Sequence, residues 1–506
     1  MLFNGFTYLV FLPLVVILHW LLPKSYRKTL LLLASYIFYM HWMPKYGLLI
    51  FALTMINYGF GLAIAGTQLH KKKKVFLVAG IVLNLSCLCF FKYTGFIVAS
   101  VFDSLKLVSP VLGVHTLDAA TSPALKIILP LGISFFTFEF IHYITDVYRG
   151  SPPIRNIRDF ALFAAFFPSQ IAGPIKRFQD FVTQLKEESI FSAAYFQDGI
   201  FLILQGLFKK VALGDNLGAL VNAGYAGIHT LSTADAWITV SAFTLQLFFD
   251  FAGYTDIGRG SALLLGYKVP ENFNWPYFAA NLTEFWHRWH ISLSTWLRDY
   301  LFIPLGGSRG SPWQTSRNTF LTMVLGGLWH GASWNFVFWG VLHGAGLVLS
   351  KDWHSYVSKV PYLARLRPHP LWHCAGVLST VFFWLLTGVL FRAATLPEAL
   401  TMGQNLFFNQ TSRASLAFGQ ICTQFLESTI PAALLIYSIF CLGRYFTARL
   451  SDMQDMQDVQ IANPFKSIIQ WTGQSMPFKL ASCVFVAVLI LGFAPSQIIP
   501  FIYFQF

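Results

Sequence analysis

Residues 46–66 have the sequence YGLLIFALTMINYGFGLAIAG, a continuous apolar run. A helix needs about 20 mostly apolar residues to cross a bilayer, so this stretch predicts a membrane-spanning helix. Comparable apolar runs recur along the chain, at residues 6–22, 75–91, 127–144, 236–251, 320–349, 375–391, 430–443 and 480–495. Strand-like alternation of polar and apolar residues is weak, which argues against a membrane barrel. We therefore expect an all-α integral membrane protein.

The composition of the 506-residue chain supports this fold class. Hydrophobic residues make up 55% and charged residues only 11%, whereas soluble globular proteins carry about 25% charged residues. These proportions exclude soluble, disordered and fibrous classes. We expect roughly ten to twelve helices that enter the membrane, some of them re-entrant. We treat residues 1–506 as one membrane-embedded domain, with peripheral helices at 1–102, a catalytic core at 125–345 and C-terminal helices at 370–506.

The net charge of +13 would suggest a nucleic-acid partner in a soluble protein. Here the basic residues cluster after the first, third and fifth apolar runs, counting residues 29–42 as the second, as the positive-inside rule predicts for cytoplasmic loops. This pattern places the amino terminus outside and the basic loops in the cytoplasm. We expect membrane lipids as partners and no nucleic acid.

A break in the apolar pattern lies between residues 158 and 178. The apolar piece 160–167 is too short to cross a membrane, and it is followed by PSQIAGP at 168–174 and by Lys176 and Arg177. Such a break is tolerated at membrane depth only where it faces protein or a wet cavity. The pattern predicts a re-entrant segment at a cavity that opens toward the cytoplasm.

The most polar central stretch, residues 258–310, contains a predicted amphipathic helix at 285–300. Its apolar stripe has helical spacing and consists of Phe285, Trp289, Leu293, Trp296 and Tyr300. This helix either lies at the membrane interface or lines the cavity. The basic residues Lys176, Arg177, Arg288 and Arg298 have two interpretations: they attract a polyanionic donor such as a nucleotide thioester, or they snorkel at the interface.

The candidate catalytic histidine, His330, lies in the segment GGLWHGASWN at 326–335, inside an apolar run. An ionisable residue at membrane depth usually faces an interior cavity, and a neutral imidazole there can act as a general base. The alternative is a hydrogen bond to a neighbouring helix. His343 repeats this setting in GVLHG. On one continuous helix it cannot share a face with His330, so we favour a structural role for His343.

A metal site is not expected. His287 and His290 form an HxxH pattern, and Glu139 and Glu284 each begin an E-x-x-H pattern, but few other carboxylates lie at depth to complete a di-metal centre. The six cysteines contain no CxxC pair, which argues against a zinc or disulfide framework. The G-x-S-x-G match at 306–310 lacks the strand–turn–helix context of a nucleophile elbow and predicts a glycine-rich loop.

Several motifs together resemble one family, the membrane-bound O-acyltransferases (MBOATs). They are QIAGP at 170–174, FDFAGYTD at 249–256, NFNWPY at 272–277, FWHRWHISLSTWLRDY at 285–300, IPLGG at 303–307, GLWHGA at 327–332 and FIYFQF at 501–506. The resemblance covers most of the chain and is densest between 245 and 345. One departure is His287, where relatives often have Arg or Asn.

The resemblance implies a helical bundle around a funnel, with the invariant histidine of the family at His330 and its second signature position at His290. It implies an enzyme of the bacterial inner membrane that takes an acetyl group from a cytoplasmic donor, acetyl-CoA. The acetyl group then crosses to periplasmic partners for O-acetylation of an exopolysaccharide such as alginate. We expect His330 and His290 to be catalytic, with no bound cofactor, and substrate-binding side chains at Arg288, Trp289, Arg298, Trp329 and Asn335.

Three alternatives remain open at this point. A polysaccharide or lipid transporter would have the cavity without acyl transfer. An O-acyltransferase for another cell-envelope glycan would share the chemistry but not the polymer. A membrane metalloenzyme would copurify with a metal. A covalent acyl-enzyme is not expected, because no activated Ser or Cys is evident.

Overall fold

The computed structural model describes residues 1–108, 127–171, 173–187 and 189–408, and isolated positions beyond 408. The apolar runs predicted at 430–443 and 480–495 lie outside the described residues, as does most of the 501–506 motif. Within the described part the regular secondary structure is helical, apart from one isolated bridge between Phe273 and Trp289. The chain divides into two compact units: unit 1 is Met1–Gly199, Gly258–Ala399 and Pro500–Phe506, and unit 2 is Ile200–Ile257 and Leu400–Ile499.

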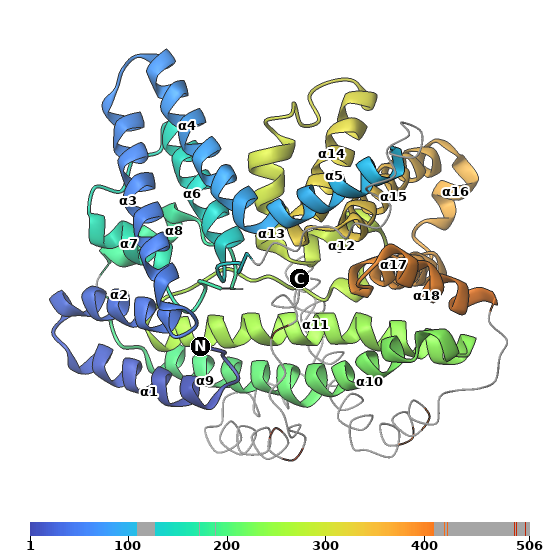
Figure 1. Ribbon diagram of the computed structural model, residues 1–506, viewed down its shortest axis with the longest axis horizontal. Coiled ribbons are helices and arrows are strands. Elements are labelled where there is room, and N and C mark those ends of the chain that lie inside the picture. Colours follow the sequence, from blue (N-terminus) through green and yellow to red (C-terminus); the bar gives the residue numbers. More distant parts are fainter. Residues whose placement is uncertain are drawn as a thin grey trace, which may run out of the picture. The chain divides into compact units, whose positions relative to one another are not determined.

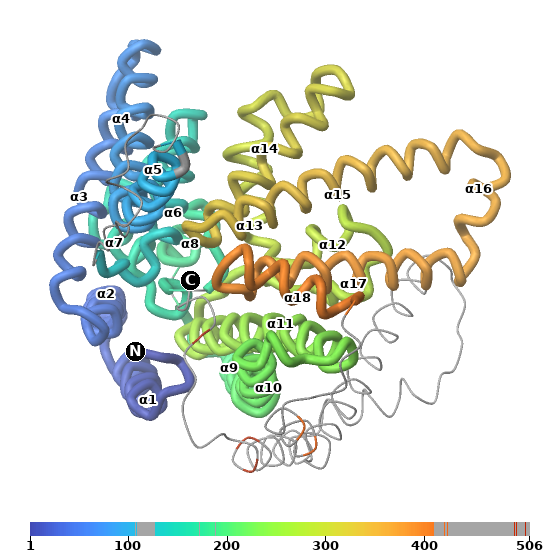
Figure 2. The backbone as a smooth tube through the Cα atoms, turned by 45° about the vertical axis from the view of Figure 1, so that its right-hand side comes forward, coloured from blue at the N-terminus to red at the C-terminus, as the bar shows by residue number. Residues whose placement is uncertain are grey.

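The N-terminal helices of unit 1 confirm the predicted apolar runs. They are α1 (Phe6–Leu21), α2 (Lys24–Met40), α3 (Pro44–Gly66), α4 (His70–Leu88) and α5 (Thr94–Val108), and a π-helical turn, η1 (Cys89–Tyr93), joins the last two. Helices α3 and α4 pack against each other and against α6 (Ile133–Tyr148), as Figures 1 and 2 show. Asn57 of α3 and Asn84 of α4 exchange two buried amide hydrogen bonds, of 3.1 and 2.7 Å. Such side-chain pairs hold membrane helices together.

Four helical segments in the described part are long and apolar enough to cross a membrane. These segments are Pro44–Gly66, His70–Lys106, Thr233–Leu264 and Pro370–Arg392, and α1 is a shorter apolar helix. The chain is therefore a membrane protein by its helices as well as by its composition. The count of roughly ten to twelve membrane-entering helices stays a prediction.

The short apolar piece after residue 156 forms α7 (Ile157–Ala165), which ends before a buried turn and is followed by α8 (Phe178–Lys186). The side chain of Asn156 caps the start of α7 by accepting from the backbone of Arg158 and Asp159. Gly173 is required within the turn, because a Cβ atom there would overlap Ser169. The local expectation of a short helix and a break is confirmed, and the cavity beside it stays a prediction.

The prediction of a single helix at 285–300 is wrong. The structure has α12 (Leu282–Arg288), a break, α13 (Ile291–Leu297) and a π-helical turn η6 (Arg298–Phe302). The backbone N–H of Asn274 donates to the carbonyl of Arg288 at 2.9 Å, and the N–H of Ile291 donates to the carbonyl of Asn272 at 2.9 Å. This pairing with the segment 272–274 replaces helical hydrogen bonds, so the helix is interrupted at Trp289 and His290.

The run 320–349 is two helices rather than one span. Helix α14 (Pro312–His330) ends at the candidate histidine, and α15 (Trp334–Lys359) begins after a three-residue break. The two helices pack closely, because Gly327 of α14 lies against Gly340 of α15, where a Cβ atom would meet backbone at 2.9 Å. Helices α16 (Pro361–Leu366) and α17 (Pro370–Arg392) follow, and α17 packs on α15.

Unit 2 contains a buried charge cluster on the FDFAGYTD motif. The ammonium of Lys210 lies 2.5 Å from a carboxylate oxygen of Asp215 and 2.8 Å from one of Asp250, and Lys209 pairs with Asp256 at 2.6 Å. These ion pairs tie the helices of this unit together. The remaining helices of the described chain are α9 (Ala193–Leu207), η3 (Phe208–Gly214), α10 (Asp215–Ala226), η4 (Ile228–Thr230), α11 (Thr233–Leu264), η5 (Pro276–Phe278) and α18 (Leu396–Phe408).

Candidate active site

His330 is the last residue of α14 and has aromatic rings on three sides. Its ring centroid lies 5.0 Å from that of Trp329, 5.2 Å from that of Trp339 and 5.2 Å from that of Phe391, all in edge-to-face contacts. Only 6% of the residue is exposed. These rings come from α14, α15 and α17, so three helices fix one imidazole in a setting with little water.

His290 occupies the break between α12 and α13 in a left-handed backbone conformation, with φ of 42°. A non-glycine residue there costs on the order of 1–3 kcal/mol, and such strain gathers at functional sites. Its imidazole lies 6.3 Å from the indole of Trp329, measured between ring centroids. Burial lowers the pKa of His290 to about 3, so the ring is neutral at physiological pH and can both donate and accept a hydrogen bond.

The two candidate catalytic residues are therefore brought to one place, on the ring of Trp329. The break at residues 331–333 also changes the relation between His330 and His343. The prediction that they cannot share a face assumed a continuous helix, and the helix is not continuous. Both imidazoles contact Trp339, at 5.2 Å for His330 and 4.3 Å for His343.

His343 has the structural contacts expected of a residue that joins helices. Its Nε2 lies 3.1 Å from the hydroxyl oxygen of Thr387 on α17, and it is fully buried. Indole rings of Trp286 and Trp384 lie 5.4 Å away. This arrangement agrees with the favoured role of His343 as a hydrogen-bonding contact between α15 and α17.

The other predicted substrate-binding residues have different surroundings. Trp329 contacts both histidines, whereas Trp289 is packed against Phe285 and Trp384, with centroids 5.7 and 4.8 Å apart. The side-chain amide of Asn335 donates to the backbone carbonyl of Ala393 at 2.7 Å. Trp289 and Asn335 therefore contact other residues of the protein in this structure, and their contact with a substrate stays a prediction.

The four candidate basic residues do not form one group. Lys176 is buried and pairs with Glu139 at 2.6 Å, and Arg288 pairs with Glu284 at 2.5 Å. Arg298 is different, because 59% of its side chain is exposed and its one ion pair within the described chain is with its neighbour Asp299.

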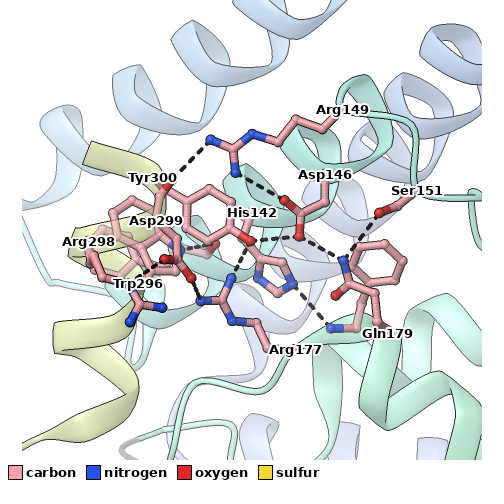
Figure 3. Close-up of polar contacts among 12 residues, drawn as sticks. His142, Asp146, Arg149, Ser151, Arg177, Gln179, Trp296, Arg298, Asp299 and Tyr300 are labelled. Atoms are coloured by element: carbon pink, nitrogen blue, oxygen red, sulfur yellow. Dashed lines mark hydrogen bonds and ion pairs between the residues drawn. The ribbon is translucent and has the colours of Figure 1, made fainter. Parts of the chain in front are cut away.

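Arg177 and Arg298 belong to a polar cluster at the ends of α6, α8 and η6 (Figure 3). The two guanidinium groups bind opposite oxygens of Asp299, at 2.5 and 2.8 Å. Tyr300 donates to Asp146 at 2.7 Å and accepts from Arg177. A third guanidinium, that of Arg149, donates to the backbone carbonyl of Asp299 at 3.0 Å. The cluster joins three arginines and two carboxylates, so it carries a net positive charge.

The residues of the two E-x-x-H patterns have ordinary partners. Glu139 and Glu284 form the ion pairs above, and His142 Nε2 accepts from the backbone N–H of Phe178 at 3.2 Å. Across the described residues, no group of three or more His, Cys, Asp or Glu side chains is arranged to hold a metal ion. The G-x-S-x-G match is a turn, as predicted, with left-handed glycines at Gly306 and Gly307.

One residue at this site was missed in the sequence, Lys92 of η1. Its ammonium reaches the C-terminal end of α14 and donates to the carbonyl of His330 at 3.1 Å. The available signal was a lone lysine within an apolar, membrane-spanning stretch, which is a functional-site candidate by default. Lys92 lay just beyond the run assigned to residues 75–91.

The class of the protein follows from comparison with a known family of membrane-bound acyltransferases. The model of the MBOAT, membrane-bound O-acyltransferase family, matches residues 16–392. The chain belongs to this family and is an O-acyltransferase, so a transporter without acyl transfer is not retained.

The chain is similar to several bacterial enzymes. It is 37% identical to the probable alginate O-acetylase of Azotobacter vinelandii, over 99% of both chains. It is 41% identical to the probable alginate O-acetylase of Pseudomonas aeruginosa, over 88% of this chain and 82% of the other. It is 36% identical to the peptidoglycan O-acetyltransferase of Helicobacter pylori, over 74% of this chain and 72% of the other.

Proposed function

We propose that this chain is a multi-pass enzyme of the bacterial inner membrane that transfers the acetyl group of cytoplasmic acetyl-CoA for the O-acetylation of an alginate-type exopolysaccharide. The near full-length similarity to two probable alginate O-acetylases supports this polymer. The immediate acceptor is a hydroxyl group, either of the sugar or of a periplasmic partner protein that completes the modification.

The observation that carries the chemistry is the meeting of His290 and His330 on one indole ring. His330 acts as the general base: it removes the proton of the acceptor hydroxyl while the oxygen attacks the thioester carbonyl. The C–S bond then breaks, and the thiolate of coenzyme A takes up the proton from His330. General-base catalysis of this kind contributes typically 10²–10⁴-fold in rate.

His290 has one of two roles in this reaction. It positions the acceptor, or it donates a hydrogen bond to the oxyanion that forms when the carbonyl is attacked. A neutral imidazole serves both roles, and the fixed backbone at the α12–α13 break restricts the movement of the ring. Trp329, which contacts both histidines, is expected to contact the reacting groups.

Electrostatics supports a donor that approaches from the cytoplasmic side. The cluster of Arg149, Arg177 and Arg298 has surplus positive charge, and such a patch raises the local concentration of a polyanion such as the nucleotide part of acetyl-CoA. Arg298 is the most exposed of the three, and is the arginine we expect to contact the donor.

The polymer is tested in the natural host after deletion of the gene and complementation with the unchanged protein or with His330→Leu. The acetyl content of the secreted polysaccharide and of peptidoglycan is measured by proton NMR. We expect alginate acetylation to return only with the unchanged protein. Loss and return of acetyl groups on peptidoglycan alone would contradict alginate as the polymer and support the second candidate, for which the Helicobacter pylori relative is the precedent.

A further inference from the structure

Helix α14 ends at the proposed catalytic base without a cap of its own. Gly331, the residue directly after the helix, has an extended backbone, with φ of −157° and ψ of 150°. The last four carbonyl groups of any α-helix lack partners within that helix. In a buried setting each unpaired carbonyl is costly, so the end of α14 requires donors from elsewhere.

Three consecutive carbonyls at this end are bonded by two neighbouring side chains of a distant segment. The hydroxyl of Tyr93 donates to the carbonyl of Leu328 at 2.9 Å. The ammonium of Lys92 donates to the carbonyl of Trp329 at 2.5 Å and to that of His330 at 3.1 Å. Lys92 also lies 5.8 Å from the centroid of the Trp329 ring.

The donors come from an irregular turn. Residues Cys89–Tyr93 form the π-helical turn η1, which interrupts the apolar segment His70–Lys106. Wide turns of this kind are rare and are frequently found at functional sites. Here the turn carries two consecutive polar side chains that both reach the end of α14, although most other side chains of the segment are apolar.

The charge of Lys92 has no carboxylate partner among the residues that the structure describes. Placing a lysine in a membrane-spanning segment costs free energy, and ionisable residues at such positions usually have a function. The C-terminal end of a helix carries partial negative charge, which an ammonium group stabilises. The ammonium of Lys92 thus contacts two residues of the candidate site, Trp329 and His330.

We propose that Lys92 is a positioning residue for His330, assisted by Tyr93. The ammonium fixes the last turn of α14 and thereby the direction of the imidazole and of the indole beside it. Misplacement of a catalytic group by about 1 Å can cost on the order of 10²-fold in rate. This inference rests on the proposed role of His330 as the general base.

The test uses inverted inner-membrane vesicles from the natural host, in which the cytoplasmic face is outward and the native partners are retained. A limiting amount of [1-¹⁴C]acetyl-CoA is added, and its cleavage is followed as a single turnover. The rate constant reached at saturating vesicle protein reports the chemistry of the competent molecules. The amount of vesicle protein that gives half of this rate constant rises when fewer molecules are competent. A purely structural role changes only this half-saturating amount.

For Lys92→Met we expect the rate constant at saturating vesicle protein to fall by about 10- to 100-fold, with little change in the half-saturating amount of vesicle protein. Lys92→Arg keeps the charge and the donors, and should recover a large part of the rate. The matched control is Thr94→Val, since the Thr94 hydroxyl bonds the carbonyls of Cys89 and Phe90 in η1 rather than carbonyls of α14. Its loss should leave the rate constant unchanged.

An unchanged rate constant in Lys92→Met would overturn the proposal. If that variant does not fold, Tyr93→Phe decides: the proposal requires a lowered rate constant in Tyr93→Phe, and an unchanged one contradicts it. His330→Leu separates the two claims. Activity in His330→Leu refutes the general base itself, whereas loss in His330→Leu with a normal rate in Lys92→Met refutes only the positioning role.

Discussion

His290 lies in the break between α12 and α13 and His330 at the end of α14, but both imidazoles lie against the indole ring of Trp329, with centroid distances of 6.3 and 5.0 Å. Two interruptions of helical structure create this relationship. One opens the chain between α12 and α13, and the other ends α14. A continuous helix at either place would direct the histidine side chain elsewhere. The proposed catalytic arrangement therefore depends on the two helix breaks.

Because His290 has a left-handed backbone, replacing it with glycine removes the imidazole while keeping the local backbone conformation. In His290→Gly the conformation becomes permissible without strain, so the thermal stability in detergent should be retained. The imidazole is lost, and the single-turnover rate constant should fall by about 10²-fold or more, as for removal of an oxyanion-stabilising donor. A stable variant with an unchanged rate constant would show that His290 has only a structural role.

His343 provides the contrasting case of a buried imidazole outside the reaction. His343→Leu fills similar space but loses the hydrogen bond to Thr387, and should lower stability by about 0.5–1.5 kcal/mol. The rate constant for acetyl-CoA cleavage should remain close to that of the unchanged protein. A large fall in that rate constant would place His343 in the catalytic machinery.

The contact between α14 and α15 predicts different responses at two adjacent glycines. A Cβ on Gly327 would meet the backbone of Phe336 and Gly340, whereas one on Gly326 would meet only the end of the Leu297 side chain, at 3.2 Å. Gly327→Ala should therefore destabilise by about 1–3 kcal/mol through overpacking, and Gly326→Ala by clearly less. Thermal unfolding midpoints in one detergent compare the two, and equal midpoints would contradict the close packing.

The buried pair of Lys176 and Glu139 is expected to stabilise the fold rather than to attract the donor. Lys176→Met leaves a buried carboxylate unpaired and should cost about 3–5 kcal/mol. The double variant with Glu139→Leu removes both charges and should recover much of that loss. Arg298→Met, at an exposed position, serves as the control and should cost less than about 1 kcal/mol. No recovery in the double variant would contradict the pairing.

Much of the fold could be predicted from local sequence patterns. The apolar run at 46–66 is helix α3 (Pro44–Gly66), the run at 375–391 is α17 (Pro370–Arg392), and the Pro/Gly-rich stretch after residue 167 is a turn. These features depend on the hydrophobicity of a segment about one helix long and on the special backbone conformations of proline and glycine. Neighbouring residues in the chain determine them, so a local pattern is sufficient.

The breaks at the site could not be predicted in the same way. The break at His290 depends on hydrogen bonds to residues 272–274, a pairing that no local periodicity reveals. The helical spacing from Phe285 to Tyr300 instead favoured a continuous helix. The role of Lys92 was missed because its partners, the carbonyls of Trp329 and His330, lie on another helix. The family resemblance identified the two histidines, but only the structure shows the indole ring that both contact.

The central claim is that His330 is the general base of acetyl transfer, and single-turnover cleavage of [1-¹⁴C]acetyl-CoA by His330→Leu in inverted inner-membrane vesicles tests it most directly. His343→Leu is the matched control, because it removes another buried imidazole from the same aromatic cluster. We predict that His330→Leu reaches the membrane in normal amount and is slowed by about 10²–10⁴-fold, while His343→Leu is not. A rate constant in His330→Leu equal to that of the control would contradict the account.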